Sequence, residues 1–201
     1  MAEPATLRPR SAFCGLLQPV GSPGQAGVTA TERADLQIAT VSARGDPGAL
    51  SARVRSACGV DLPFGPRVSA GGRITFMGIG PRTWLAIREG AGALSDELRH
   101  ELREAAAVAD QSDGYAVMRL SGAKVRATFE KGLGVDLHPR LFRAGDGAVT
   151  ACAHLGVILW QLDEMPTYEV AVFRSLAAAF WQWLSESAAE YGLAVVPSQV
   201  S

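Results

Sequence analysis

Charged residues are scarce in this 201-residue sequence. Only 19% of the residues are charged, and 19 basic against 20 acidic side chains leave a formal net charge of -1. Proteins that bind nucleic acid without sequence specificity need a strongly basic surface, because Lys and Arg side chains supply their affinity by displacing counterions. The composition therefore excludes that class. A charged share below the usual value of about 25% also predicts that a partner covers part of the surface.

Paired cysteines and long apolar runs are missing as well. Cys14, Cys58 and Cys152 lie far apart and include no C-x-x-C pair, which argues for a reducing compartment and against a structural zinc site. The apolar run at 12–17 is shorter than the core of a signal peptide, and no stretch approaches the roughly 18 apolar residues of a membrane span. We expect a cytoplasmic protein that binds neither membrane nor nucleic acid.

The first 34 residues predict an extended N-terminal arm. They are rich in Pro, Gly, Ala and Ser, and such a segment cannot bury enough apolar surface to offset the entropy lost on ordering. Its one apolar patch, 11–17, contains Phe13 and Leu16. We expect these side chains to pack on the chain's own domain or on a neighbouring subunit. A flexible linker is the alternative that composition leaves open.

From residue 35 the hydrophobic periodicity predicts an α+β fold of two related βαββα units. The order strand, helix, strand, strand, helix occupies 35–107 and returns over 108–193, before a C-terminal tail at 194–201. The letters Gly-Val-Asp-Leu follow the first helix of each unit, at 59–62 and 134–137. This echo indicates an internal duplication, with antiparallel sheets and helices packed on one face of each sheet.

The last predicted helix carries two tryptophans that cannot share one core. At about 100° per residue, Trp181 and Trp183 project roughly 160° apart. Trp183 shares its helical stripe with Phe180, so we expect Trp183 in the core. We expect Trp181, together with Phe13 and Leu16, at an interface with another subunit, where aromatic residues are enriched. The alternative is a helix wedged between two sheets of its own chain.

Few residues are candidates for a catalytic, ligand-binding or metal-binding role. Cys152 and His154 alternate on a predicted strand and would point the same way about 7 Å apart, but without a third ligand or oxyanion device a packed strand is favoured. Asp110 and Asp113 could bind a cation or an amine, and a turn with Asx hydrogen bonds is favoured. The glycines of 78–80 predict a hairpin rather than a dinucleotide site, because no helix follows. We assign no catalytic, cofactor-binding or metal-ligating residue.

Several short motifs, taken in their joint order, resemble the gamma subunit of heterotetrameric sarcosine oxidase. Each motif is weak by itself, and the resemblance covers about residues 8–193. The motifs are Ser11-Ala12-Phe13-x-Gly15-Leu16, Thr31-Glu32-Arg33, Gly78-Ile79-Gly80-Pro81-x-x-Trp84-Leu85, Val108-x-Asp110-Gln111-Ser112, Gly134-Val135-Asp136-Leu137-His138-Pro139 and Phe180-Trp181-x-Trp183-Leu184.

The resemblance implies a duplicated ferredoxin-like fold, similar to the folate-binding part of aminomethyltransferases. It implies a non-catalytic subunit of an enzyme that converts sarcosine, tetrahydrofolate and oxygen to glycine, methylene-tetrahydrofolate and hydrogen peroxide. FAD, FMN and NAD would be held by the alpha and beta subunits and zinc by the delta subunit, so this chain would hold no cofactor and would contact chiefly the alpha subunit. The alternatives are a free-standing folate-binding or aminomethyltransferase-like protein and a non-enzymatic adaptor.

Overall fold

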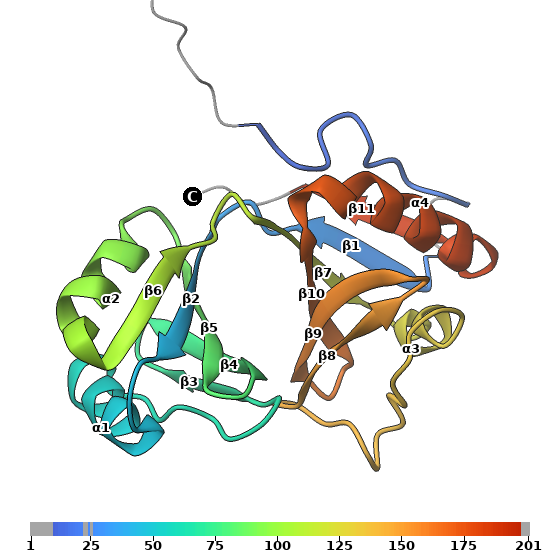
Figure 1. Cartoon of the computed structure of the whole chain (residues 1–201). Helices are drawn as coiled ribbons and strands as arrows, with labels where there is room; N and C mark the ends of the chain where they lie inside the picture. Colours follow the sequence, from blue (N-terminus) through green and yellow to red (C-terminus); the bar gives the residue numbers. More distant parts are fainter. Residues whose placement is uncertain (1–9, 22–23, 25, 198–201) are drawn as a thin grey trace, which may run out of the picture.

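Two β-sheets pack face to face, and helices cover the outer face of each sheet (Figure 1). The computed structural model describes residues 10–21, 24 and 26–197. The outer parts of the predicted arm and tail therefore lie outside the described residues. No helix in the described ranges is long and apolar enough to cross a membrane.

The first unit contains a sheet of five strands and two helices on one of its faces. Asp46 caps the first helix, because its carboxylate accepts hydrogen bonds from the backbone N–H groups of Gly48 and Ala49. Gly59 ends that helix in the left-handed conformation, with φ 68°. The elements are β2 (Leu36–Ala43), α1 (Pro47–Cys58), β3 (Val68–Gly71), β4 (Ile74–Gly80), β5 (Thr83–Glu89), α2 (Leu94–Leu102) and β6 (Ala106–Asp110).

The second unit repeats this order of elements in a sheet of six strands. Its elements are β7 (Tyr115–Ser121), α3 (Val125–Phe129), β8 (Gly147–Cys152), β9 (Leu155–Asp163), β10 (Thr167–Phe173), α4 (Ala177–Ala188) and β11 (Leu193–Val196). Short 3-10 helices lie at Arg103–Ala105, Arg174–Leu176 and Ala189–Tyr191.

The strand orders confirm the predicted α+β duplication. The first sheet has the order β3-β4-β5-β2-β6, and the second has β8-β9-β10-β7 followed by β1 (Val28–Glu32) and β11. Each strand of the first unit therefore has a counterpart at the same place in the second. All strand pairs are antiparallel except β1 with β11, which are parallel. The one topological difference is β1, which is inserted between β7 and β11.

Four short strands differ from the sequence-based expectation, and one of them, β3, adds a third strand between the two helices of the first unit. β1 lies inside the predicted arm, β11 crosses into the predicted tail, and β6 spans the predicted boundary at 107/108 while it pairs with β2. Each has four or five residues, too few to show a clear alternation of apolar and polar side chains. Hydrogen bonding to neighbouring strands, not local propensity, makes these segments strands.

The core has three parts. One part covers the outer face of each sheet, and the third lies between the two sheets. The first lies between the five-stranded sheet and the helices α1 and α2, and the second lies between the six-stranded sheet and α3, α4 and the N-terminal segment. The third, which we call the inter-sheet core, joins the two units. It consists of Leu36, Ile38, Met77, Leu85, Ile87, Val117, Ile158, Trp160 and Ala171.

The N-terminal segment runs along α4 and corrects the prediction for the two tryptophans. The side chain of Arg174, before α4, donates a hydrogen bond to the carbonyl of Arg10, and beyond α4 the N–H of Val20 donates to Leu193 O at 2.9 Å. The side chain of Phe13 is only 1% exposed and belongs to the same core as Trp181, which is 6% exposed. The expectation that Trp181 faces away from its own core is therefore wrong.

Helix α4 has apolar partners on two sides, its own sheet and the N-terminal segment. Trp183 is only partly buried, and its ring stacks on that of Phe129 at a centroid distance of 6.4 Å. Leu16 is also partly buried against this core. The expectation that the two tryptophans cannot share one core is therefore wrong, because both pack in the core that also contains Phe13 of the N-terminal segment.

Candidate functional site

Five charged side chains meet where the chain crosses from one sheet to the other. Arg33 and Asp35 lie between β1 and β2, Glu89 ends β5, Arg119 belongs to β7 and Glu169 to β10. We call these residues the ionic cluster. Because they come from both units, they connect the two sheets at the margin of the inter-sheet core.

Arg33 is the central donor of the ionic cluster. Its guanidinium donates to both carboxylate oxygens of Asp35 at 2.9 Å, to Glu89 at 2.5 Å and to Glu169. Arg119, opposite Glu169 in the strand register, donates to the same Glu169 oxygen at 2.7 and 3.1 Å. Side chains of Arg33 and Glu169 are 7% and 5% exposed, so the pair is buried.

Burial and ion pairing shift the pKa values of Arg33 and Glu169 in opposite directions. Burial raises the pKa of Glu169, although the charge of Arg33 and its hydrogen bond lower it. Burial also opposes the charge on Arg33, but the hydrogen bond to Asp35 and the charge of Glu169 outweigh it, so the pKa of Arg33 is raised. The hydrogen bond from Arg33 lowers the pKa of Asp35. Each charge in the buried pair therefore depends on the other.

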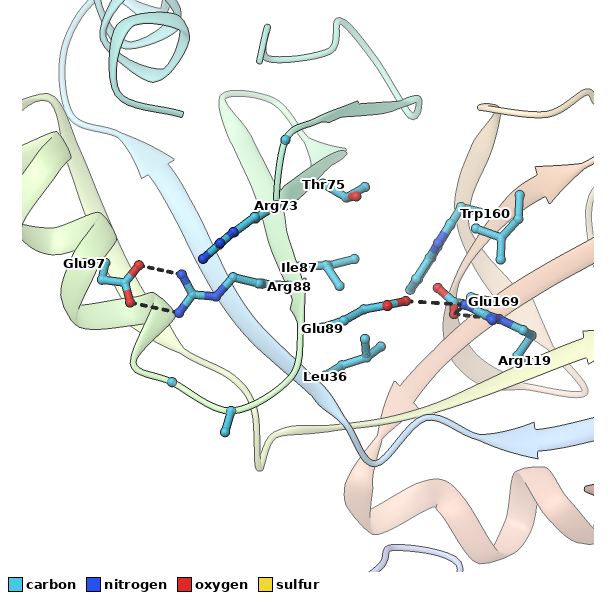
Figure 2. A pocket seen from close by; sticks show the side chains of 14 residues that line it. Leu36, Arg73, Thr75, Ile87, Arg88, Glu89, Glu97, Arg119, Trp160 and Glu169 are labelled. Carbon is cyan, nitrogen blue, oxygen red and sulfur yellow. Dashed lines mark hydrogen bonds and ion pairs between the residues drawn. The ribbon is translucent and has the colours of Figure 1, made fainter. Parts of the chain in front are cut away.

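The ionic cluster forms part of the wall of a cleft of about 640 Å³ (Figure 2). Apolar side chains of the two sheets line the cleft, among them Leu36 and Trp160. On the other side, Arg88 donates to the two oxygens of Glu97 at 2.5 and 2.9 Å and to Gln37 at 3.1 Å. Gln37 in turn accepts from the N–H at the start of α2, Leu94, at 2.9 Å.

Ion pairs engage the acidic side chains of this cleft. Its three carboxylates, Glu89, Glu97 and Glu169, are each paired with an arginine. The hydrogen bond from Arg88 lowers the pKa of Glu97, whereas burial raises the pKa of Glu169. The pair of Arg119 with Glu89 joins the two units, and the pair of Arg88 with Glu97 lies within the first unit.

Cys152 and His154 do not lie on one face of a strand, contrary to the sequence-based expectation. β8 ends at Cys152, and the two following residues, Ala153 and His154, have φ 47° and 70°. Such positive values are typical of the two-residue turn that joins hairpin strands. Cys152 is fully buried, and burial raises the pKa of its thiol to about 12. His154 is exposed. Cys152 therefore lies in the packed strand that the sequence favoured, and His154 lies in the turn.

Asp110 forms the turn that the sequence favoured. Its carboxylate accepts hydrogen bonds from the backbone N–H of Ser112 at 2.9 Å and from the hydroxyl of Ser95 at 3.2 Å. The Ser112 hydrogen bonds lower the pKa of Asp110. Asp113 is exposed at the end of the same turn. Within the described residues, no group of three or more His, Cys, Asp and Glu side chains is placed to hold a metal ion.

The glycine-containing segment at 78–80 is part of a hairpin, as predicted. It ends β4, and Pro81 and Arg82 turn the chain into β5, with Arg82 at φ 60°.

The ionic cluster was missed in the sequence because its members come from four separate segments. One signal was available: Glu169 and Arg119 each interrupt an otherwise apolar strand. A charge on the buried face of a strand needs a partner of opposite charge, and the alternation of these two strands could have pointed to both residues.

Comparison with known proteins links most of the chain to one enzyme family. The family model for the sarcosine oxidase gamma subunit matches residues 42–190. A chain of the heterotetrameric sarcosine oxidase from Corynebacterium sp. U-96, solved in complex with pyrrole 2-carboxylate, is 26% identical. It superposes with a TM-score of 0.80 over 91% of this chain and 96% of that chain.

A more distant structure shares the fold. The glycine cleavage system aminomethyltransferase T from Bartonella henselae is 14% identical and has a TM-score of 0.62 over 86% of this chain and 48% of that chain. No curated protein sequence matches. Because the family model covers most of both units, this chain belongs to the sarcosine oxidase gamma subunit family.

Proposed function

We propose that the chain is the non-catalytic gamma subunit of a heterotetrameric sarcosine oxidase. The observation that carries this proposal is the similarity to a chain of such an assembly, which extends over 91% of this chain and 96% of that one. A free-standing aminomethyltransferase-like protein is less favoured, because the likeness to aminomethyltransferase T covers only 48% of that chain.

In this proposal the assembled enzyme oxidises sarcosine with oxygen and transfers the one-carbon unit to tetrahydrofolate. Its products are glycine, methylene-tetrahydrofolate and hydrogen peroxide. FAD, FMN and NAD belong to the alpha and beta subunits and zinc to the delta subunit, and the alpha subunit is the chief partner of this chain. A cytoplasmic location agrees with Cys14, Cys58 and Cys152, all free thiols in the structure.

The electrostatics of the chain support a structural role. The carboxylates of the cleft are occupied by arginines, and the Cys152 thiol, with a pKa of about 12, stays protonated at neutral pH. The thiol is therefore not prepared for nucleophilic attack. The pairs of Arg33 with Glu169 and of Arg119 with Glu89 connect the two units, as a subunit that presents fixed surfaces to its partners requires.

The isolated chain provides the test. Purified alone, it should be colourless and should release no hydrogen peroxide when sarcosine is added, because in this proposal the other subunits hold the flavins. Visible flavin absorbance in the purified chain, or peroxide formation by it, would contradict the non-catalytic assignment.

A further inference from the structure

We propose that the outer edge of β8 binds an extended apolar segment of a partner subunit, which adds to the six-stranded sheet and fills the groove around that edge. This inference rests on the proposed function, since it requires that the chain be part of a hetero-oligomer. It concerns a face of the molecule apart from the cleft and its ionic cluster.

β8 is the last strand of its sheet, and its outer side is paired only near its ends. The N–H of Gly147 donates to Pro66 O at 2.8 Å, and the N–H of Gly134 donates to Ala151 O at 3.1 Å. Backbone groups of alternate residues point to the same side of a strand. The N–H and C=O of Val149 therefore point outward between these two contacts, and within the described residues no hydrogen bond to either group is found.

An apolar groove of about 910 Å³ surrounds this edge. The groove reaches both faces of β8. Ala148 belongs to the core beneath the helices, whereas the neighbouring Val149 is paired with Ile158 of the inter-sheet core and so lies on the opposite face. The groove is thus in line with the free edge. Its lining residues are Pro47, Pro63, Phe64, Gly65, Pro66, Gly78, Ile79, Gly80, Pro81, Arg82, Trp84, Val135, Phe142, Gly147, Ala148 and Val149.

One wall of the groove is held in place before any partner arrives. The indole N–H of Trp84 donates to Pro63 O at 2.9 Å, and Gly65 O lies 2.0 Å from where a Cβ on Gly78 would be. The segment 63–66 is therefore packed directly on the backbone of β4. It carries Phe64, whose side chain is 97% exposed. A rigid wall that displays a large apolar side chain lowers the entropy cost of binding.

The chemistry of the groove specifies its occupant. Arg82 is the one charged residue in the lining, and its guanidinium donates to the carbonyl of Gly45. An uncharged, apolar segment suits this lining, and side chains that alternate along an extended segment would enter the groove on both sides of β8. The open stretch from Gly147 to Ala151 is about 14 Å long at roughly 3.4 Å per residue, so about three residues of the segment can pair with it.

A second copy of this chain does not fit this edge. The backbones of Pro66 and Gly134 lie at hydrogen-bond distance outside β8, where the next strand of the sheet would run. Two β8 edges brought together would bring these segments of both copies into the same space. Such blocking is how edge strands avoid pairing with themselves, whereas a short stretch of about three residues can still pair between the two blocked ends.

Hydrogen exchange of the free chain and of the assembled complex tests the proposal directly. In the free chain the outward amides of Val149 and Ala151 should exchange rapidly, and after assembly they should slow at least tenfold. Unchanged rates at both positions in a complex that does assemble would overturn the proposal and leave the proposed function intact. Slow exchange already in the free chain, or a dimer of the free chain, would mean a different occupant and would also overturn it.

Matched substitutions of exposed apolar residues give a second test. Phe64→Ser should weaken assembly of the full complex at least tenfold, whereas Met165→Ser, in the turn between β9 and β10 and 81% exposed, should leave it unchanged. Neither side chain is part of the core, so both variants should fold. Equal assembly of both variants would contradict a role for the groove. If the unaltered chain fails to assemble at all, the proposed function fails and this inference falls with it.

Discussion

At the scale of single residues, the buried pair of Arg33 and Glu169 is the most consequential electrostatic feature. Glu169→Ala would leave the buried Arg33 with Asp35 and Glu89 alone, and removal of one member of a buried pair costs about 3 kcal/mol of unfolding free energy. Denaturant unfolding of the isolated chain measures this loss. Asp61→Asn is the control, because it breaks the exposed pair with Arg55 and should leave the unfolding midpoint unchanged. Equal midpoints for both variants would contradict the account.

Cys152 gives a second prediction at this scale. Its thiol has a pKa of about 12 because it is buried, and at pH 9 only about one thiol in a thousand would be ionised. Iodoacetamide at that pH should modify the exposed Cys14 in the folded chain and should reach Cys152 only after denaturation. Mass spectrometry of the labelled peptides decides this. Labelling of Cys152 at the rate of Cys14 in the folded chain would show that it is an accessible thiolate.

At the scale of elements, helix α4 depends on the N-terminal segment that covers it. Phe13→Ala and Trp181→Ala should each destabilise the isolated chain by about 3–5 kcal/mol, the usual loss when a large aromatic side chain is removed from a packed core. Phe64→Ala, at a side chain that is 97% exposed, is the control and should not change the melting temperature. Thermal melts followed by circular dichroism measure the three variants.

The outcome that would contradict this description of α4 is specific. If Phe13→Ala melts at the temperature of the unaltered chain, the N-terminal segment does not contribute to the core. If Trp181→Ala melts at the temperature of the unaltered chain but weakens assembly with partner subunits, Trp181 is an interface residue, as its sequence position alone first indicated.

The same elements show what could be predicted from the sequence. The strands with six or more residues and the capped helix α1 were predictable, because alternation and the Asp46 and Gly59 signals are local. Strands β1, β6 and β11 were not, because they are defined by hydrogen bonds to distant segments. For the same reason the ionic cluster was not predicted: Arg33 and Glu169 are 136 residues apart, and only the fold brings them together.

At the scale of the whole molecule, the inter-sheet core and the ionic cluster join two similar units. The low content of charged residues agrees with the presence of an interaction surface. An apolar groove lies on the surface beside the partly paired edge of β8, and Phe64 is exposed there. Exposed apolar patches of this kind mark interaction surfaces in proteins that assemble.

If this chain is a structural subunit of sarcosine oxidase, it co-purifies with the other subunits of the enzyme. The chain is tagged and expressed together with the alpha, beta and delta subunits, and the purified material is assayed for its subunits, its flavin and its sarcosine-dependent production of peroxide. We predict that all four chains elute together in equal amounts, with bound flavin and activity that the tagged chain lacks when expressed alone. Elution of the tagged chain without the other subunits would contradict this subunit assignment.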